Sequence, residues 1–148
     1  MDTSFKQGRT EDRAMIQAVV NRYAHTARDK MDFADMIPLF SGNSTIVLPG
    51  GTKIPPNQLR EVLRGEEAKF IRHHVTTIDI RFVGPNEAEV ESFFFAVTNE
   101  APLDHWGSWR DKFVRQADGS WLISVREINP EGGDPKGWFM RKYGAQAG

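Results

Sequence analysis

The chain has 148 residues, of which 39% are hydrophobic and 26% are charged, as is typical of one compact globular domain. Its 19 basic and 20 acidic residues give a formal net charge of −1, so it carries neither a broad basic surface for nucleic acid nor a polybasic membrane anchor. The absence of cysteine excludes disulfides, a thiolate nucleophile and a cysteine metal site. No segment has the pattern of a signal peptide or a membrane span, so we expect a cytoplasmic protein that binds a small molecule.

The first predicted element is an amphipathic helix over Glu11–Arg28, which follows a capping residue at Thr10. Four side chains recur on one face at spacings of three and four: Ile16, Val20, Tyr23 and Ala27. This periodicity predicts that Tyr23 points into the core.

Two shorter helices are predicted next. One follows the capping residue Asp32, stops at Gly42, and should be kinked or shortened by Pro38. After an extended segment, STIVLPGG, the proline-opened run PPNQLREVLRGEEAKF reads as a third helix. Its predicted buried side consists of Leu59, Val62, Leu63 and Phe70.

From residue 75 the hydrophobic period changes from helical to two, which predicts strands. The segments VTTIDIRF, EVESFFFAV, HWGSWRDKFVRQ and WLISVREI are separated by turns and form a hairpin-rich meander. We therefore predict a single α+β domain over residues 1–148, with a core at about 10–128, in which three amino-terminal helices cover a cone-shaped, curved antiparallel sheet. The interior of such a cone is the expected place for a small-molecule site.

Aromatic residues also indicate surfaces that must be covered. Three consecutive phenylalanines, Phe93–Phe95, place bulk on both faces of their strand, and a partner subunit, a bulge or the carboxy-terminal tail could cover the outer face. The tail, residues 129–148, carries Trp138, Phe139 and Tyr143, so it should pack on the domain or on a neighbour.

The residues that could perform chemistry favour acid–base catalysis. The four histidines have no close metal-ligand spacing, and His73 and His74 are strand neighbours that point to opposite faces, so we expect no metal and no cofactor. A histidine titrates near neutrality and works as a general base when a partner fixes its tautomer. Asp29, just after the first helix, is the candidate partner, because the chain there turns back toward the strand of His73.

Most of the chain, at about residues 10–128, resembles the SnoaL-like branch of the nuclear transport factor two superfamily. The run AMIQAVVNRYAHTARDKMDFADMIPLF, the segment RHHVT and the hairpin FVRQADGSWLISVREI carry the resemblance. The family pattern has an aspartate at the end of the first helix and a second aspartate three residues later. It also has an HxxT motif, in which two residues separate a histidine from a threonine. Here these match Asp29, Asp32, and His73 with Thr76.

The resemblance implies a conical fold, a homodimer or homotrimer, and a site like that of the family's lyases. In their mechanism His73 would take a proton from carbon, Asp29 would orient it, and Arg126 would assist the leaving group. The tryptophan of the family's dehydrochlorinases falls near Ile46, so a chlorinated substrate is not implied. The superfamily also contains silent binding domains, so the fold alone does not assign an activity.

Strand alternation conflicts with this assignment at one point. A regular strand would place His74, not His73, on the face of Ile78, Ile80 and Phe82. We follow the HxxT pattern and predict an irregularity between Val75 and Ile78 that turns His73 inward.

Three further residues are predicted to bind substrate. Tyr23 could donate a hydrogen bond to a substrate oxygen, although the sequence favours a structural core tyrosine with a satisfied hydroxyl. Arg126 shares strand parity with Leu122, opposite Trp121, so alternation leaves its direction ambiguous. His105 is placed at the mouth of the cavity. The sequence thus supports two functions, a cofactor-independent lyase or isomerase and a non-catalytic ligand-binding or assembly module.

Overall fold

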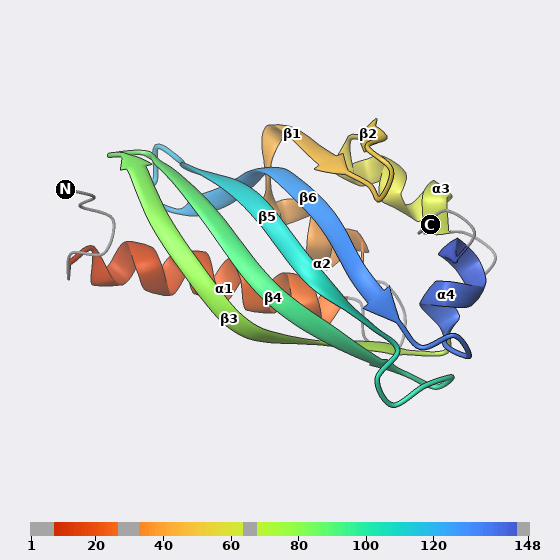
Figure 1. The fold of residues 1–148 in the computed structure, drawn as a ribbon. Coiled ribbons are helices and arrows are strands. Elements are labelled where there is room, and N and C mark those ends of the chain that lie inside the picture. The colour runs from red at the N-terminus through yellow and green to blue at the C-terminus, as the bar shows by residue number, and fades with distance from the viewer. Residues whose placement is uncertain (1–7, 27–32, 64–67, 145–148) are drawn as a thin grey trace.

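The computed structural model describes residues 8–26, 33–63 and 68–144, and Figure 1 shows a curved sheet with the long helix α1 lying across one face. Two 3₁₀ turns, Ile37–Leu39 and Pro56–Gln58, precede β1 and α3. The helices and strands are α1 (Thr10–Thr26), α2 (Phe33–Met36), β1 (Phe40–Val47), β2 (Lys53–Ile54), α3 (Leu59–Leu63), β3 (Ile71–Gly84), β4 (Glu87–Thr98), β5 (His105–Arg115), β6 (Trp121–Gly133) and α4 (Trp138–Tyr143).

The helix α1 presents the inward face that its periodicity predicts. Ile16, Val20 and Tyr23 are buried in the main core, and the helix contacts β3 and β6. The helix begins at Thr10, one residue before the predicted start, so Thr10 is its first residue and not its cap; Ala27 lies outside the described residues. Tyr23 therefore points inward from the wall that closes one face of the sheet.

The two later helices are shorter than predicted. α2 ends at Met36 and is followed by a 3₁₀ turn that contains Pro38, because proline cannot donate a backbone hydrogen bond within a helix. Phe40 already belongs to β1, so the predicted stop at Gly42 was wrong and Gly42 lies inside a strand.

The third helix was also predicted too long. α3 ends at Leu63, and Phe70 lies just before β3 rather than on a helix; residues 64–67 are outside the described part of the chain. Leu59 is buried as predicted, whereas Val62 is 37% exposed, because a single short helix presents only part of its apolar side to the core.

The six strands have the order β2-β1-β6-β5-β4-β3. The strands β3 to β6 form the predicted antiparallel meander, but β1 pairs with β6 in parallel, so the sheet is mixed. The α+β class is confirmed, and the description of the sheet as purely antiparallel is corrected. The parallel pairing arises because the chain crosses over between β1 and the meander, which local patterning does not reveal.

The tail packs on the domain. β6 extends to Gly133, five residues beyond the predicted end, and α4 follows with Trp138 and Phe139 buried. In Figure 1, α4 and α3 lie at the same end of the sheet, where Lys142 Nζ donates a hydrogen bond of 3.4 Å to the Leu63 carbonyl. No helix within the described ranges is long and apolar enough to cross a membrane.

Candidate active site

A cavity of about 100 Å³ lies where α1, α3 and α4 meet the sheet. Two histidines line it, His73 from β3 and His105 from β5. The remaining lining is mainly apolar and aromatic, with Tyr23, Phe94 and Trp109 among its side chains. Two ionisable imidazoles in a small apolar space can take part in proton transfer under conditions that exclude bulk water.

A bulge in β3 selects His73 for this cavity. Val75 pairs with Phe94 and Thr77 pairs with Phe93, so Thr76 is an extra residue in β3. The predicted irregularity is therefore confirmed. His73 lines the cavity, whereas His74 is exposed on the outer face. The Thr76 hydroxyl donates a hydrogen bond of 3.2 Å to the Phe93 carbonyl, so the threonine of the HxxT motif holds the bulge.

The environment of His73 strongly favours the neutral imidazole. Its ring packs against Phe94 and Trp109, each with a centroid separation of 5.4 Å. Burial, reinforced by His105, Arg126 and His74, lowers the pKa of His73 to about 3. Its Nδ1 is enclosed and has no hydrogen-bond partner among the described residues. Asp29 lies outside those residues, so the predicted Asp29–His73 dyad stays a prediction.

The described residues contain a different aspartate–histidine pair. Asp104 Oδ1 lies 2.8 Å from Nδ1 of His105, and both side chains are buried. An ionised carboxylate only accepts hydrogen bonds, so this contact places the proton of the neutral ring on Nδ1 and leaves the lone pair on Nε2. His105 lines the cavity as predicted, but sequence reasoning did not identify Asp104. Its position directly before a histidine was the available signal.

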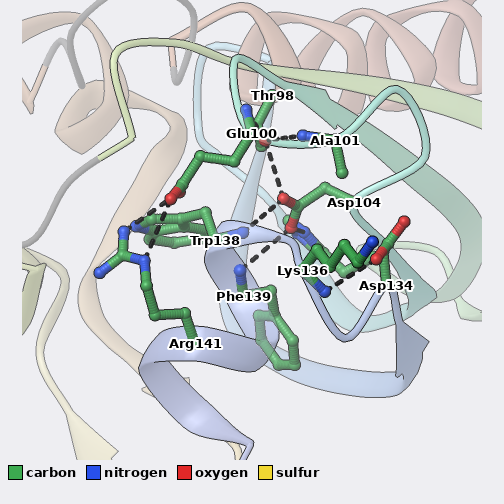
Figure 2. A network of polar contacts seen from close by, with 10 residues as sticks. Thr98, Glu100, Ala101, Asp104, Asp134, Lys136, Trp138, Phe139 and Arg141 are labelled. Atoms are coloured by element: carbon green, nitrogen blue, oxygen red, sulfur yellow. Dashed lines mark hydrogen bonds and ion pairs between the residues drawn. The ribbon is translucent and has the colours of Figure 1, made fainter.

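Asp104 is held by an unusually complete set of donors, as Figure 2 shows. Its Oδ2 accepts hydrogen bonds of 2.7 Å from the Thr98 hydroxyl and from the Trp138 backbone N–H, and its Oδ1 accepts one of 3.1 Å from the Phe139 backbone N–H. A Cβ atom at Gly137 would stand 2.6 Å from Oδ2, so only glycine fits there. The same carboxylate thus orients His105 and binds the first turn of α4.

These contacts set the charges of the pair. Burial alone would raise the pKa of Asp104, but the hydrogen bonds from His105, Thr98, Phe139 and Trp138 together hold it below its usual value. Burial lowers the pKa of His105, while the Asp104 carboxylate acts in the opposite direction. The pair is therefore an ionised carboxylate beside a neutral imidazole whose cation has a charged partner.

Arg126 lies inside the core beneath the cavity. It is 0% exposed and forms two hydrogen bonds to Asp111, Nε to Oδ1 at 2.8 Å and Nη2 to Oδ2 at 2.6 Å. Its guanidinium carbon stacks 3.9 Å from the Tyr23 ring centroid and 4.4 Å from that of Trp109. Burial raises the pKa of Tyr23, an effect that the charge of Arg126 opposes, so the phenol keeps its proton and can donate a hydrogen bond.

The inward direction of Arg126 resolves the ambiguity left by strand alternation. Lys112 pairs with Val125 and Phe113 pairs with Ile123, so Ser124 is an extra residue in β6. This bulge places Arg126 on the buried face of Trp121 and Ile123, not on the opposite face that uninterrupted alternation gives. The direction that strand parity left open is therefore inward.

The neutral state of His73 predicts a pH dependence of stability. Its folded-state pKa of about 3 lies below the unfolded value near 6.5, so between these pH values the unfolded chain binds a proton that the folded chain does not. His73 should therefore contribute a decrease in the free energy of unfolding of about 1.4 kcal/mol for each pH unit as the pH falls through this interval. Denaturant titrations from pH 7 to pH 4 should show a smaller slope for His73→Gln. An unchanged slope in His73→Gln would contradict the assignment.

Within the described ranges, no group of three or more histidine, aspartate or glutamate side chains is placed to hold a metal ion. The chemistry available to the cavity's described side chains includes proton transfer by two histidines and hydrogen bonding by Tyr23 and Tyr143.

Comparisons with known proteins identify the family and the fold of this chain. The model of the family described as SnoaL-like domain matches residues 8–127. No curated protein sequence matches the chain. A candidate scytalone dehydratase from Novosphingobium aromaticivorans has a similar solved structure, with a TM-score of 0.72, 20% identity, and coverage of 84% of this chain and 87% of that chain.

Two further solved structures are similar to this fold. A hexachlorocyclohexane dehydrochlorinase from Novosphingobium barchaimii has a TM-score of 0.72 and 14% identity, with coverage of 85% of this chain and 90% of that chain. A protein of unknown function with a cystatin-like fold from Nostoc punctiforme has a TM-score of 0.71 and 19% identity, with coverage of 84% and 95%. At these identities the likeness shows a shared fold.

Proposed function

Because this chain belongs to the SnoaL-like domain family, we propose that it is a cofactor-independent lyase or isomerase that acts by general acid–base catalysis on a small, largely apolar substrate. The observation that carries the proposal is the presence of two buried or half-buried histidines, His73 and His105, in one mainly apolar cavity. Similar solved structures include a candidate dehydratase and a dehydrochlorinase, and both names denote elimination reactions.

In this proposal His73 is the general base and Asp29 orients it. A neutral imidazole can accept a proton, but burial lowers the pKa of His73 to about 3 and weakens it as a base. The role proposed for Asp29 is to raise that pKa again, because a carboxylate beside the ring favours the imidazolium. Tyr23 lines the cavity with a protonated phenol and can stabilise developing negative charge on a substrate oxygen. Arg126, which is ion-paired with Asp111, stacks behind the Tyr23 ring on the core side of the cavity.

The residues fit several reactions that share one first step. Dehydration, elimination, a double-bond shift and ring closure each begin when a base removes a proton from an acidic carbon. A positioned histidine accelerates such a step by roughly 10²–10⁴. The residues that line the cavity therefore support a reaction class rather than one substrate.

A proton-exchange screen tests the proposal directly. Small ketones, hydroxyketones and hydroxylated or halogenated ring compounds are incubated with the protein in D₂O, and ¹H NMR follows the loss of carbon-bound hydrogen and the appearance of products. We expect exchange or conversion of at least one compound by the wild-type protein. Binding of a compound by saturation-transfer NMR with neither exchange nor conversion of any compound would favour the non-catalytic module.

One observation favours that second candidate, a ligand-binding or assembly module. On the outer face of the sheet Phe93 is 46% exposed and Trp106 is 38% exposed, and His74 stacks on Phe95 with a centroid separation of 4.8 Å. Contiguous exposed aromatic side chains are typical of protein interfaces. The homodimer or homotrimer implied by the family stays a prediction, and this aromatic face is the surface that it would bury.

A further inference from the structure

A second and larger hollow adjoins the histidine cavity. This groove has a volume of about 580 Å³ and lies between the turn after β1, the carboxy-terminal half of β6, and α4. Six side chains line both spaces: Leu48 and Pro49 from the turn, Ile128 and Pro130 from β6, and Phe139 and Tyr143 from α4. Because they come from three separate segments, these six side chains surround the border between the cavity and the groove on three sides.

The groove opens where β1 bends away from β6. The two strands pair in parallel as far as Val47 and Glu127, and β6 continues to Gly133. In the turn after β1, Gly50 and Gly51 both have a φ of +92°, a conformation that favours glycine. Figure 1 shows β1 and β6 diverging toward the end of the sheet where α4 lies. The local sequence of this turn therefore creates the space beside the cavity.

The cavity alone is smaller than the space that one aromatic ring requires. Its volume is about 100 Å³, whereas an apolar cavity of roughly 150 Å³ holds a single benzene ring. A ligand of ring size or larger that reaches the two histidines must therefore extend past the six shared side chains. The groove is the adjoining space that can hold the rest of the ligand.

The cavity and the groove differ in chemical character. The cavity is mainly apolar and aromatic around its two histidines. The charged side chains among the described residues that line the groove are Glu127 and Glu131, and the amide of Asn129 lies between them on β6. Arg110 lies near both carboxylates but is already ion-paired with Glu91 on β4, so it neutralises them only in part. Carboxylates accept hydrogen bonds and attract cations, so a protonated amine fits this groove better than an anion.

We propose that the groove is a second binding site, and that its ligand is a two-part molecule with an apolar end in the histidine cavity and a protonated amine in the groove. The inference rests on the proposed function and deepens it by naming the substrate class, a largely apolar amine whose reacting carbon lies at the apolar end. Glu127 and Glu131 are then the residues that determine specificity for the charged end.

Three probes of similar length test this preference: 4-phenylbutylamine, 4-phenylbutan-1-ol and 4-phenylbutyrate. They share a phenyl ring and a chain and differ in the charge at the far end. NMR titration of the isotope-labelled protein gives the dissociation constants, and we expect the amine to bind about 10-fold more tightly than 4-phenylbutyrate, with the alcohol between them. The amine should shift the ring signals of His73 and His105 together with the backbone signals of Glu127 and Glu131, because one molecule spans both spaces.

Three variants locate the binding site. The double variant Glu127→Gln with Glu131→Gln should bind the three probes with similar affinity. The matched control, Glu87→Gln with Glu89→Gln, removes the same two charges from β4 outside the groove and should keep the preference for the amine. Leu48→Trp places a larger side chain at the border that the two spaces share, so it should weaken binding of the amine about 10-fold.

The possible results separate this inference from the proposed function. Equal affinity of the wild type for the amine and 4-phenylbutyrate, no binding of any probe, or shifts of the histidine signals without shifts in the groove would overturn the inference. A preference that survives in the groove variant, or that is lost in the β4 control, would also overturn it, and so would unchanged affinity of Leu48→Trp. Selective binding of the amine across both spaces, with no exchange of any compound in the D₂O screen, would instead refute the proposed function and leave the binding site in place.

Discussion

Replacing His73 with glutamine should lower kcat by about 10²–10⁴ and abolish exchange of the carbon-bound hydrogen, with little change in the fold. Glutamine has a similar reach and can form hydrogen bonds, but it cannot accept a proton at neutral pH. His73 lines the cavity because the Thr76 bulge turns it inward, so the variant removes the base without a large change in cavity volume. Steady-state kinetics and ¹H NMR in D₂O measure the two effects.

The neighbouring histidine provides the matched control. His74→Gln makes the same chemical change one residue away, on the exposed outer face, and should keep wild-type turnover. The strand and the substitution are the same in both variants. A difference in their turnover therefore shows which face of the sheet contains the catalytic group. Equal turnover by His73→Gln and wild type would refute the assignment of His73 as the base.

Replacing Asp111 with asparagine should lower the free energy of unfolding by about 3–5 kcal/mol. The substitution leaves the guanidinium of Arg126, which is 0% exposed, without a counter-charge in the core. The stacked rings of Tyr23 and Trp109 attract a cation but do not replace a carboxylate that makes two hydrogen bonds. Urea titration of the wild type and the variant measures the difference.

Two controls test whether the loss of stability comes from leaving a buried charge unpaired or from removing a carboxylate as such. Glu91→Gln removes a carboxylate from the exposed ion pair with Arg110 and should have little effect, because solvent screens that pair. The double variant Asp111→Leu with Arg126→Met should be more stable than either single variant, because no buried charge remains. A double variant that loses the sum of the two single effects would show that packing, not the unpaired charge, accounts for the loss.

The sequence was sufficient to predict the order of the main helices and strands and the inward direction of His73. The change of period at residue 75 falls within β3, which begins four residues earlier, at Ile71. The conflict between alternation and the HxxT pattern predicted an irregularity between Val75 and Ile78, and the bulge lies in that interval. No conflict of this kind indicated the bulge at Ser124. The hydrophobic and polar side chains of that strand alternate plausibly whether Arg126 faces the core or the solvent. The direction of Arg126 therefore depended on pairing with β5, which is a tertiary property.

The Asp104–His105 pair shows a different limit of sequence reasoning. The two residues are adjacent, but the donors that fix the carboxylate come from Thr98 and from the backbone of Trp138 and Phe139, more than 30 residues later. A backbone N–H carries no residue-specific pattern, so only the folded chain reveals that the tail completes this site. The parallel pairing of β1 with β6 escaped prediction for the same reason, because it joins segments distant in sequence.

The bulge in β3 also affects how this strand can tolerate insertions and deletions. Deletion of Thr76 would restore regular alternation in β3. Each residue of the strand before position 76 would then move to the opposite face of the sheet, so His73 would turn outward and His74 inward. Because the two histidines are consecutive, an imidazole would face the interior in either register. The tandem pair thus gives the strand a built-in tolerance to a one-residue length change.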